Sequence, residues 1–304
     1  MTTTPHKLAT IANNHGIVGL GPYGSATARR AAVLTAADVG KVAQQTDTDP
    51  ATYWIVLKVV GGVGTWSRVD TGAEATGTPL TIITSVPVYN WLRADLGVTI
   101  GTGVSAWADQ SANAQSYTQG TGANQPTRNA SDATLGNQAT ITGDGVNDQL
   151  NNAAAVVPAS FWLCLVVKQI SWTINCRICE SLSGTSKANI YQGSGTPGLQ
   201  FREDALQTTA NNGATIGAWK RVTAQESNAT TDGILIGSTF VGGSALGRTA
   251  TSNQYTLFGA WAGSLTANVA IAEMILTNGI PNSTEKTNID AYLLARYGLA
   301  SLFT

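Results

Sequence analysis

Three pieces of sequence between residues 91 and 150 decide the fold class. They read WLRADLGVT (Trp91–Thr99), VSAWADQS (Val104–Ser111) and GDGVNDQL (Gly143–Leu150). In each piece, short apolar segments alternate with Gly, Asn, Asp or Ser, an alternation that is typical of strands joined by tight turns. The stretch therefore predicts an all-β domain.

Composition narrows the kinds of partner to expect. At 304 residues the chain is long enough for one large β domain and a smaller one. Charged residues make up 12% of the chain, about half of the usual share. The 33 glycines favour many short strands and turns, and the net charge of −1 gives no sign of a nucleic acid or an anionic membrane as a partner.

We expect no membrane-spanning segment and no secretory signal in this sequence. No apolar run reaches the roughly 18 residues needed to span a bilayer, so we expect no membrane segment. The first seven residues, MTTTPHK, have no apolar core of the kind found in a secretory signal. We therefore expect synthesis in a cytoplasm, without export by that route.

The cysteines Cys164, Cys176 and Cys179 are interpreted as core residues. Cys176 and Cys179 have the C-x-x-C spacing of a redox or zinc half-site. A structural zinc site needs four ligands, however, and the two histidines, His6 and His15, lie far away in the sequence. An odd number of cysteines also argues against a disulfide framework.

The N-terminal quarter of the chain predicts two parts. Residues 1–25 show little periodicity and predict an extended arm, which orders only against a neighbouring subunit. Residues 26–75 predict a small β module, because Tyr53–Val60 is dense in β-branched and aromatic residues and Thr65–Asp70 follows as a partner strand. Residues 76–87 predict a linker in which Leu80–Ile83 can pair as a strand.

Residues 88–304 predict one sandwich domain. The segment Phe161–Lys168 is apolar at both alternations, which indicates a strand covered on both faces. The domain is predicted to end in a helix over 283–297, with Asn282 as its cap, Glu285 three residues later, and Gly298 as its stop.

The order of these motifs resembles that of concanavalin A-like (laminin-G-like) jelly-roll domains. The resemblance rests on the W-x-D-x-S turn at Trp107–Ser111, the Pro126–Thr127 segment, Gly143–Leu150, and the closing strand and helix at Ile271–Leu276 and Tyr292–Gly298. It covers roughly residues 88 to 300 and implies a two-sheet jelly roll. The module at 26–75 is similar to small β modules of bacteriophage virion proteins.

No catalytic constellation is found in the sequence. β-Sandwich glucanases carry paired carboxylates in an E-x-D-x-x-E pattern, and the glutamates of this chain never form it. Glu273 is expected to pair with Arg296 instead. A Ser–His nucleophile pair would need His6 or His15, both in the predicted arm. We therefore expect a protein that is not an enzyme.

One turn carries clustered oxygen ligands. Asp144, Asn147 and Asp148 could hold a structural Ca²⁺, because lectin-like sandwiches often bind a hard cation with such groups. The same residues are ordinary β-turn formers, and this interpretation is favoured because the EF-hand spacing is absent. We expect no cofactor, with Ca²⁺ at this turn as the alternative. Asp109 is expected to bond backbone amides of its own loop.

Exposed aromatic residues are the candidates for binding. Trp172 and Trp261 lie near predicted turns and are candidates for stacking against a glycan, although a sandwich core also consumes aromatic residues. The candidates for contacts with a capsid or another partner lie in the N-terminal part: Tyr23, Tyr53, Trp54 and Trp66.

The family resemblance implies a non-enzymatic bacteriophage virion protein. We expect a capsid decoration or head-fibre protein that docks on other virion proteins, above all the major capsid protein, through its N-terminal part. It would sit on the capsid surface as a homo-oligomer, with a trimer as the favoured state. The alternative is a glycan-binding adhesin of a tail or cell surface that recognises a host-surface glycan. A polysaccharide hydrolase on the same fold is the least favoured function.

Overall fold

A computed structural model describes residues 42–45, 52–60, 63–68, 78–181, 188–193, 195–203, 207–227, 232–243, 252–260 and 263–304. Internal contacts divide the chain into two compact units, one of residues 1–78 with 291–296 and one of residues 79–290 with 297–304. The predicted arm (1–25) lies outside the described residues.

The described part of the first unit is a small antiparallel sheet. Its strands are β1 (Val42–Gln45), β2 (Thr52–Val60) and β3 (Val63–Arg68), in the order β1-β2-β3. The β2 and β3 strands cover the two segments whose β-branched and aromatic content predicted a strand pair.

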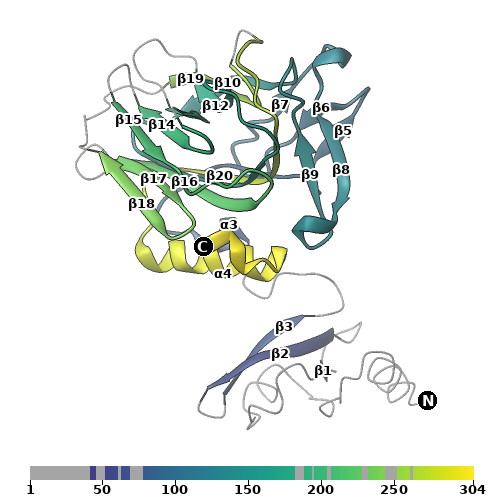
Figure 1. The fold of residues 1–304 in the computed structure, drawn as a ribbon. Coiled ribbons are helices and arrows are strands. Elements are labelled where there is room, and N and C mark those ends of the chain that lie inside the picture. Colours follow the sequence, from purple (N-terminus) through teal and green to yellow (C-terminus); the bar gives the residue numbers. More distant parts are fainter. Residues whose placement is uncertain are drawn as a thin grey trace. The chain divides into compact units, whose positions relative to one another are not determined.

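The second unit is an all-β sandwich of two antiparallel sheets, as predicted (Figure 1). Among the described residues, the first sheet has nine strands, in spatial order β15 (Gln207–Asn211), β14 (Leu199–Glu203), β13 (Ala188–Gln192), β12 (Arg177–Ser181), β19 (Ser252–Leu257), β10 (Leu150–Val157), β7 (Tyr117–Thr118), β6 (Val104–Trp107) and β5 (Val98–Ile100). The second has eight: β18 (Thr239–Gly243), β17 (Asp232–Ile236), β16 (Trp219–Glu226), β11 (Phe161–Gln169), β20 (Val269–Asn278), β9 (Gln138–Thr142) and β8 (Thr127–Asp132), with β4 (Val88–Arg93) also paired to β20.

The central strands of the eight-stranded sheet are buried on both faces. In β11, alternate residues Phe161, Leu163, Leu165 and Val167 belong to the core between the sheets. The residues between them, such as Trp162, are also buried, on the outer face of the sheet. A strand covered on both sides was predicted from the unbroken apolar run, and the structure confirms it.

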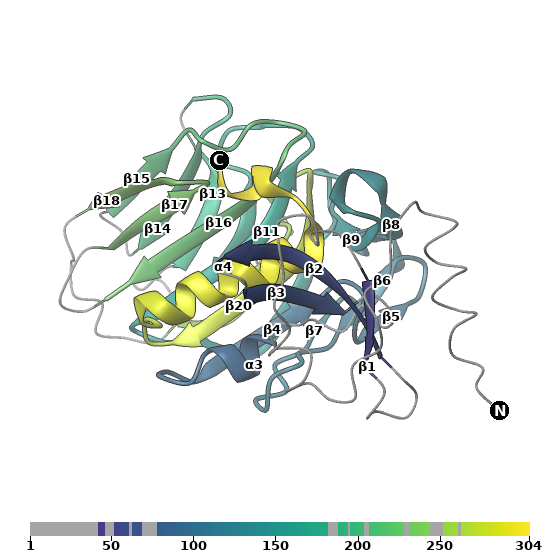
Figure 2. The same cartoon turned by 90° about the horizontal axis from the view of Figure 1, so that it is seen from below.

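Helix α4 (Ser283–Tyr297) covers the outer face of this sheet (Figures 1 and 2). Its start is a capping box, in which the Glu285 amide donates to Asn282 Oδ1 (3.0 Å) and the Asn282 amide donates to Glu285 Oε2 (3.1 Å). Gly298 follows the last residue with a φ of 66°, the left-handed conformation that ends many helices.

Short helices occupy several connections. Helix α3 (Pro79–Ile82) lies in the predicted linker, so the expectation that Leu80–Ile83 pairs as a strand is wrong. Pro79 stands at the first helical position, where its missing N–H costs nothing. The 3-10 turns are η2 (Gly122–Asn124), η3 (Ala133–Leu135) and η4 (Ala300–Phe303).

The side chain of Asp109 fastens the W-x-D-x-S turn to the sheet edge. Asp109 Oδ1 accepts from the amides of Trp91 and Ser111, both at 2.8 Å. Asp109 Oδ2 accepts from the Ser111 hydroxyl (2.7 Å) and the Gln115 amide (2.8 Å). The predicted role of Asp109 is therefore confirmed, and it extends beyond its own loop to strand β4.

Cys164, Cys176 and Cys179 are all free and buried. Burial raises the pKa of the Cys164 thiol well above its ordinary range and that of Cys179 to about 11. Thiols of this kind are unreactive, because the thiolate is the reactive form. The core interpretation of these residues is confirmed.

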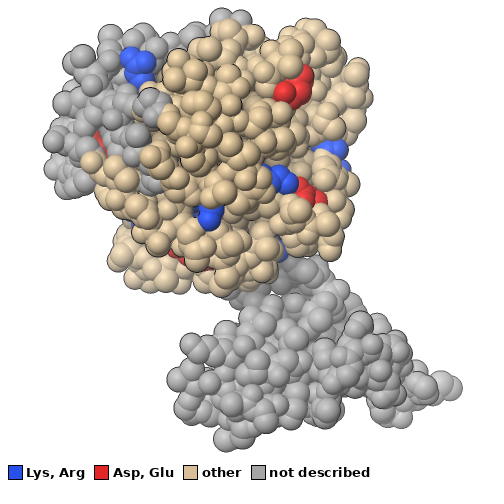
Figure 3. Space-filling model, viewed as in Figure 1, with Lys and Arg blue, Asp and Glu red and all other residues tan. Residues whose placement is uncertain are grey.

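Charged side chains are few and scattered over the described face shown in Figure 3. None of the helices that the structure describes has both the length and the apolar character needed to cross a membrane.

Candidate functional site

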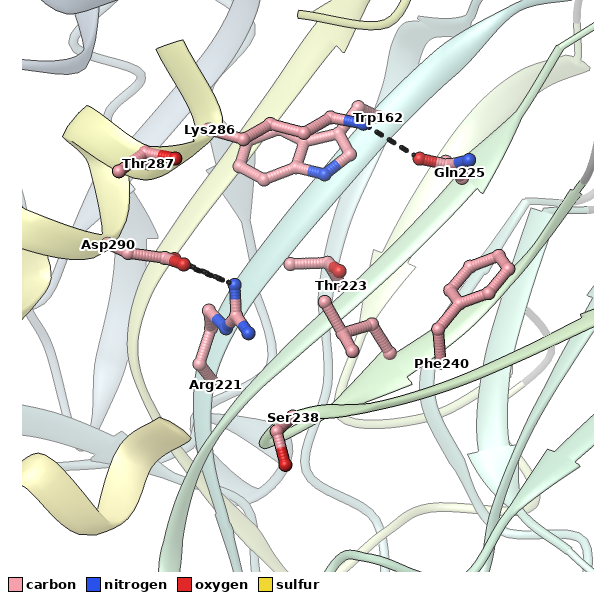
Figure 4. A pocket seen from close by; sticks show the side chains of 10 residues that line it. Trp162, Arg221, Thr223, Gln225, Ser238, Phe240, Lys286, Thr287 and Asp290 are labelled. Carbon is pink, nitrogen blue, oxygen red and sulfur yellow. Dashed lines mark hydrogen bonds and ion pairs between the residues drawn. The ribbon is translucent and has the colours of Figure 1, made fainter. Parts of the chain in front are cut away.

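A pocket of about 240 Å³ lies where helix α4 meets strands β16, β17 and β18 (Figure 4). It is lined by Trp162, Arg221, Thr223, Gln225, Leu235, Ser238, Phe240, Lys286, Thr287 and Asp290. The pocket is smaller than the roughly 300–1,000 Å³ that enclose drug-sized ligands, so its size suits a single small ring.

The alternation of strand β16 places a polar row in the pocket. Val222 and Ala224 point into the core between the sheets, so Arg221, Thr223 and Gln225 face the helix instead. The opposite wall is helical, where Lys286 and Asp290 stand four residues apart on one face of α4. Strand and helix periodicity thus bring two sets of polar side chains together.

An ion pair joins the two walls. Arg221 Nη1 donates to both oxygens of Asp290, at 2.7 and 2.8 Å, and Arg221 Nη2 donates to the carbonyl oxygen of Gly237 at 2.6 Å. The guanidinium also lies 5.2 Å from the ring centroid of Phe303. Within the described part of the chain, Arg221 Nε is buried without a hydrogen-bond partner.

Lys286 makes a second bridge between the walls. Its Nζ donates to Gln225 Oε1 at 2.9 Å, a neutral acceptor, and Figure 4 shows the side chain reaching from α4 toward β16. Burial lowers the pKa of Lys286 below its ordinary value. Burial raises the pKa of Asp290, and Arg221 opposes part of that rise.

Phe240 supplies an exposed apolar surface at the pocket. Its side chain lies on the side opposite helix α4 (Figure 4), and the residue is 44% exposed. Trp162, in contrast, is 2% exposed and contributes to the buried floor. The pocket therefore combines one accessible aromatic ring with hydrogen-bonding groups of both kinds.

Trp172 lies outside this pocket, in the connection between β11 and β12. Its indole N–H donates to the carbonyl oxygen of Gly198 at 3.2 Å, and the side chain is half-buried. The loop also carries the exposed Ile170 and Ile174. Trp172 therefore keeps part of its ring accessible and remains a candidate for glycan contact.

In the turn that carries Asp144, Asn147 and Asp148, the two carboxylates bind backbone amides of the turn, as the favoured turn interpretation expects. Asp144 Oδ1 accepts from the amides of Val146 (2.8 Å), Asn147 (3.1 Å) and Asp148 (3.3 Å), and Asp148 Oδ2 accepts from the Asp144 amide (3.0 Å). Partial desolvation acts to raise the pKa of Asp144, but these bonds outweigh it and lower the pKa. No group of three His, Cys, Asp or Glu side chains suited to a metal occurs among the described residues. The geometry is that of an Asx turn.

Three of the four predicted partner-contact residues lie in strands of the small sheet. Tyr53 and Trp54 belong to β2 and Trp66 belongs to β3, where Trp66 pairs with Val56 in the register. Tyr23 and the glycan candidate Trp261 lie outside the described residues. The roles assigned to these residues stay predictions.

The carboxylate of Glu273 is held inside the domain. Glu273 Oε1 accepts from the Trp91 indole N–H at 2.7 Å, and Glu273 Oε2 accepts from the Tyr297 hydroxyl at 2.8 Å. These bonds connect strand β4, strand β20 and the end of α4. The side chain is thus structural, and its pairing with Arg296 stays a prediction.

The sequence-based site prediction missed the pocket beneath α4. Two signals for it exist in the sequence: the polar alternation Arg221-x-Thr223-x-Gln225 beside an apolar partner face, and the spacing of Lys286 and Asp290 on one helix face. Neither signal shows that the two segments meet, because they are separated by more than 60 residues.

No protein-family model matches the chain, and no curated protein is similar to it in sequence. Among solved structures, the sialidase of Trypanosoma rangeli in complex with 2,3-difluorosialic acid is similar, with a TM-score of 0.51 and 12% identity. The similarity covers 83% of this chain and 44% of the sialidase chain, so this chain spans less than half the length of that enzyme.

Domain 4 of AbnA, a GH43 extracellular arabinanase from Geobacillus stearothermophilus solved in complex with arabinotriose, is also similar. The TM-score is 0.50 at 10% identity, over 67% of this chain and 98% of that domain. At these identities the likenesses show the fold alone, which is a jelly-roll-like β-sandwich.

Proposed function

We propose that this protein is a non-enzymatic glycan-binding protein whose sandwich takes a sugar residue in the pocket beneath α4. The observation that carries the proposal is that the exposed ring of Phe240 lines one small pocket together with the polar side chains of Asp290 and Gln225. Support for the substrate class comes from domain 4 of AbnA, a similar sandwich that is in complex with arabinotriose.

The chemistry of the lining suits a pyranose ring. A sugar presents C–H groups on its faces, which pack on an aromatic ring, and hydroxyl groups around its edge. Asp290 accepts hydrogen bonds, Lys286 donates them, and the Gln225 amide and Ser238 hydroxyl do both. A ring placed on Phe240 would thus meet donors and acceptors on the strand and helix walls.

The lining offers binding without hydrolysis. Glycosidases that use two carboxylates place them about 5–9.5 Å apart on either side of the scissile bond. Asp290 is the only carboxylate among the described residues that line this pocket, and Arg221 already holds it in an ion pair. We therefore assign no catalytic role to the site.

A binding assay with matched variants tests this function. Full-length protein is titrated with a panel of methyl glycosides, and Phe240→Ala is expected to weaken the best binding about tenfold or more through loss of the stacking surface. The control is Ile100→Ala, which removes a 55%-exposed apolar side chain from β5, in the other sheet.

Binding that is unchanged in Phe240→Ala would move the site elsewhere on the sandwich, with Trp172 as the next residue to test. Absence of binding across the whole panel would contradict the glycan function.

A virion role is the second candidate, and the two-unit organisation favours it. A small sheet that forms its own compact unit suits docking, while the larger sandwich suits display. In this proposal the protein decorates the capsid surface, contacts the major capsid protein through its N-terminal part and assembles as a homo-oligomer.

Gold-labelled antibodies against the full-length protein test the virion role directly. Label spread over virion heads supports decoration, and label confined to the tail tip supports a tail adhesin. Virions that carry no label would contradict both locations.

A further inference from the structure

Lys286 stands in the pocket as a cation whose partner is neutral. The four described ion pairs neutralise Arg93, Lys168, Arg177 and Arg221. Lys286 Nζ instead donates to the amide oxygen of Gln225, and among the described residues no carboxylate lies within ion-pair distance of it.

The electrostatics of the pocket follow from this arrangement. Arg221 and Asp290 largely cancel each other, because the guanidinium contacts both carboxylate oxygens. The ammonium of Lys286 is partly removed from water and lacks a compensating negative charge, which disfavours its charged form. The net excess of one positive charge therefore sits on the helix wall, beside the polar row of β16.

We propose, on the basis of the glycan function above, that the pocket selects an acidic sugar whose carboxylate accepts a hydrogen bond from Lys286 Nζ. An anion that enters the pocket gains a charge-assisted hydrogen bond and restores the missing counter-charge. A neutral sugar gains neither, so the unpaired ammonium becomes a source of discrimination between ligands of the same shape.

The spacing of the helix residues fits one ring. Lys286 and Asp290 are four residues apart on the helix, which is about 6 Å along the axis. A uronic acid can therefore direct its carboxylate to Lys286 and a ring hydroxyl to Asp290 while one face of the ring rests on Phe240. The orientation is set by hydrogen bonding, because Lys286 donates to the sugar carboxylate, whereas the ionised Asp290 only accepts and therefore bonds a hydroxyl.

The test compares sugars that differ only at C6. Full-length protein at low ionic strength is titrated with the methyl glycosides of glucuronic and galacturonic acid and with those of glucose and galactose. We expect at least one acidic glycoside to bind about tenfold more tightly than its neutral counterpart, as one charge-assisted hydrogen bond implies.

Substitutions of Lys286 test whether this residue causes the preference for the acidic sugar. Lys286→Gln is expected to remove the preference, because it weakens the binding of the acidic glycoside more than that of its neutral counterpart, and Lys286→Arg is expected to retain the preference. The control is Lys220→Gln. Lys220 lies on the same strand as Arg221, but its ammonium donates to the backbone carbonyls of Ser301 and Thr304 instead. Near-UV circular dichroism verifies that each variant is folded.

Two outcomes would overturn the inference. If acidic and neutral sugars bind equally well and Phe240→Ala weakens both, the pocket binds glycans but does not select acidic sugars. If Lys286→Gln still prefers the acidic glycoside, the sugar carboxylate binds a cationic side chain other than Lys286. Absence of binding by either class would contradict the glycan function itself.

Discussion

At the scale of single residues, the carboxylate of Asp109 joins segments that are distant in the chain. It accepts four hydrogen bonds, from the amides of Trp91, Ser111 and Gln115 and from the Ser111 hydroxyl. Three of the donors are backbone or side-chain groups of the loop after β6, and the fourth belongs to β4. Loss of this acceptor would leave several N–H groups unsatisfied in a partly buried place.

The predicted cost of losing this carboxylate is large. Asp109→Ala should lower the free energy of unfolding by about 3 kcal/mol, because hydrogen bonds to a charged group are strong and the orphaned donors must be desolvated. The matched control is Asp95→Ala, which removes a carboxylate side chain that is 31% exposed in its ion pair with Arg93 and should cost less than about 1 kcal/mol. Urea unfolding of both variants measures the difference, and equal costs would contradict the structural role of Asp109.

Residue-scale chemistry also explains which parts of the site could be predicted from the sequence. Asp109 and Asp144 act on amides within a few residues, so local turn chemistry is sufficient to predict them. Phe240, Arg221 and Lys286 come together only through the pairing of β16 with β17 and of β17 with β18, and through the docking of α4. Such non-local contacts cannot be inferred from spacing along one chain.

At the scale of elements, Glu285 joins the start of α4 to the segment before β4. Besides its capping role, Glu285 Oε1 accepts from the amides of Thr84 (2.6 Å) and Ser85 (2.7 Å), and Oε2 accepts from the Ser85 hydroxyl. Burial acts to raise the pKa of Glu285, but these hydrogen bonds outweigh it and lower the pKa to about 2.

This shift makes the contribution of Glu285 depend on pH. The folded-state pKa lies below the ordinary 4.5, so the stabilisation is complete above about pH 5 and is lost as the pH falls toward 2. Glu285→Gln should lower the free energy of unfolding by about 2 kcal/mol at pH 7. The gap between variant and wild type should narrow in urea unfolding between pH 5 and pH 2.5. A gap that stays constant over this range would contradict the assignment.

Element prediction succeeds where the local signals agree with the tertiary environment. The β11 strand has apolar residues on both faces and is buried on both, and the Asn282–Glu285 box starts α4 at the expected residue. It fails for Leu80–Ile83, where the apolar run indicated a strand and Pro79 opens a helical turn. The β18 strand, TFVGG, was not predicted as a separate strand because its glycines weaken the β signal.

At the scale of the whole molecule, the two units divide the work that we propose. The small sheet formed by β1, β2 and β3 is too limited to supply much core of its own, which suits a surface that docks on a partner. The sandwich holds its core between two sheets and leaves the pocket beneath α4 accessible at one outer face. In this proposal, recognition and attachment are carried by different parts of the chain.

The tryptophans provide reporters for locating the ligand on the molecule. Trp162 forms the floor of the pocket, whereas Trp172 lies in the loop between β11 and β12, outside the lining. Trp107 lies in the other sheet and is fully buried. Each indole N–H gives one separate signal in a nitrogen–proton correlation spectrum, so a bound sugar can be placed by the signal that it shifts.

The most direct test of the account is a titration of nitrogen-15-labelled full-length protein with the methyl glycoside of an acidic sugar. The pocket beneath α4 predicts that the Trp162 indole signal shifts in a saturable manner, that the Trp172 and Trp107 signals stay in place, and that Phe240→Ala abolishes the shift. A saturable shift at Trp172 with Trp162 unchanged would contradict the pocket as the binding site.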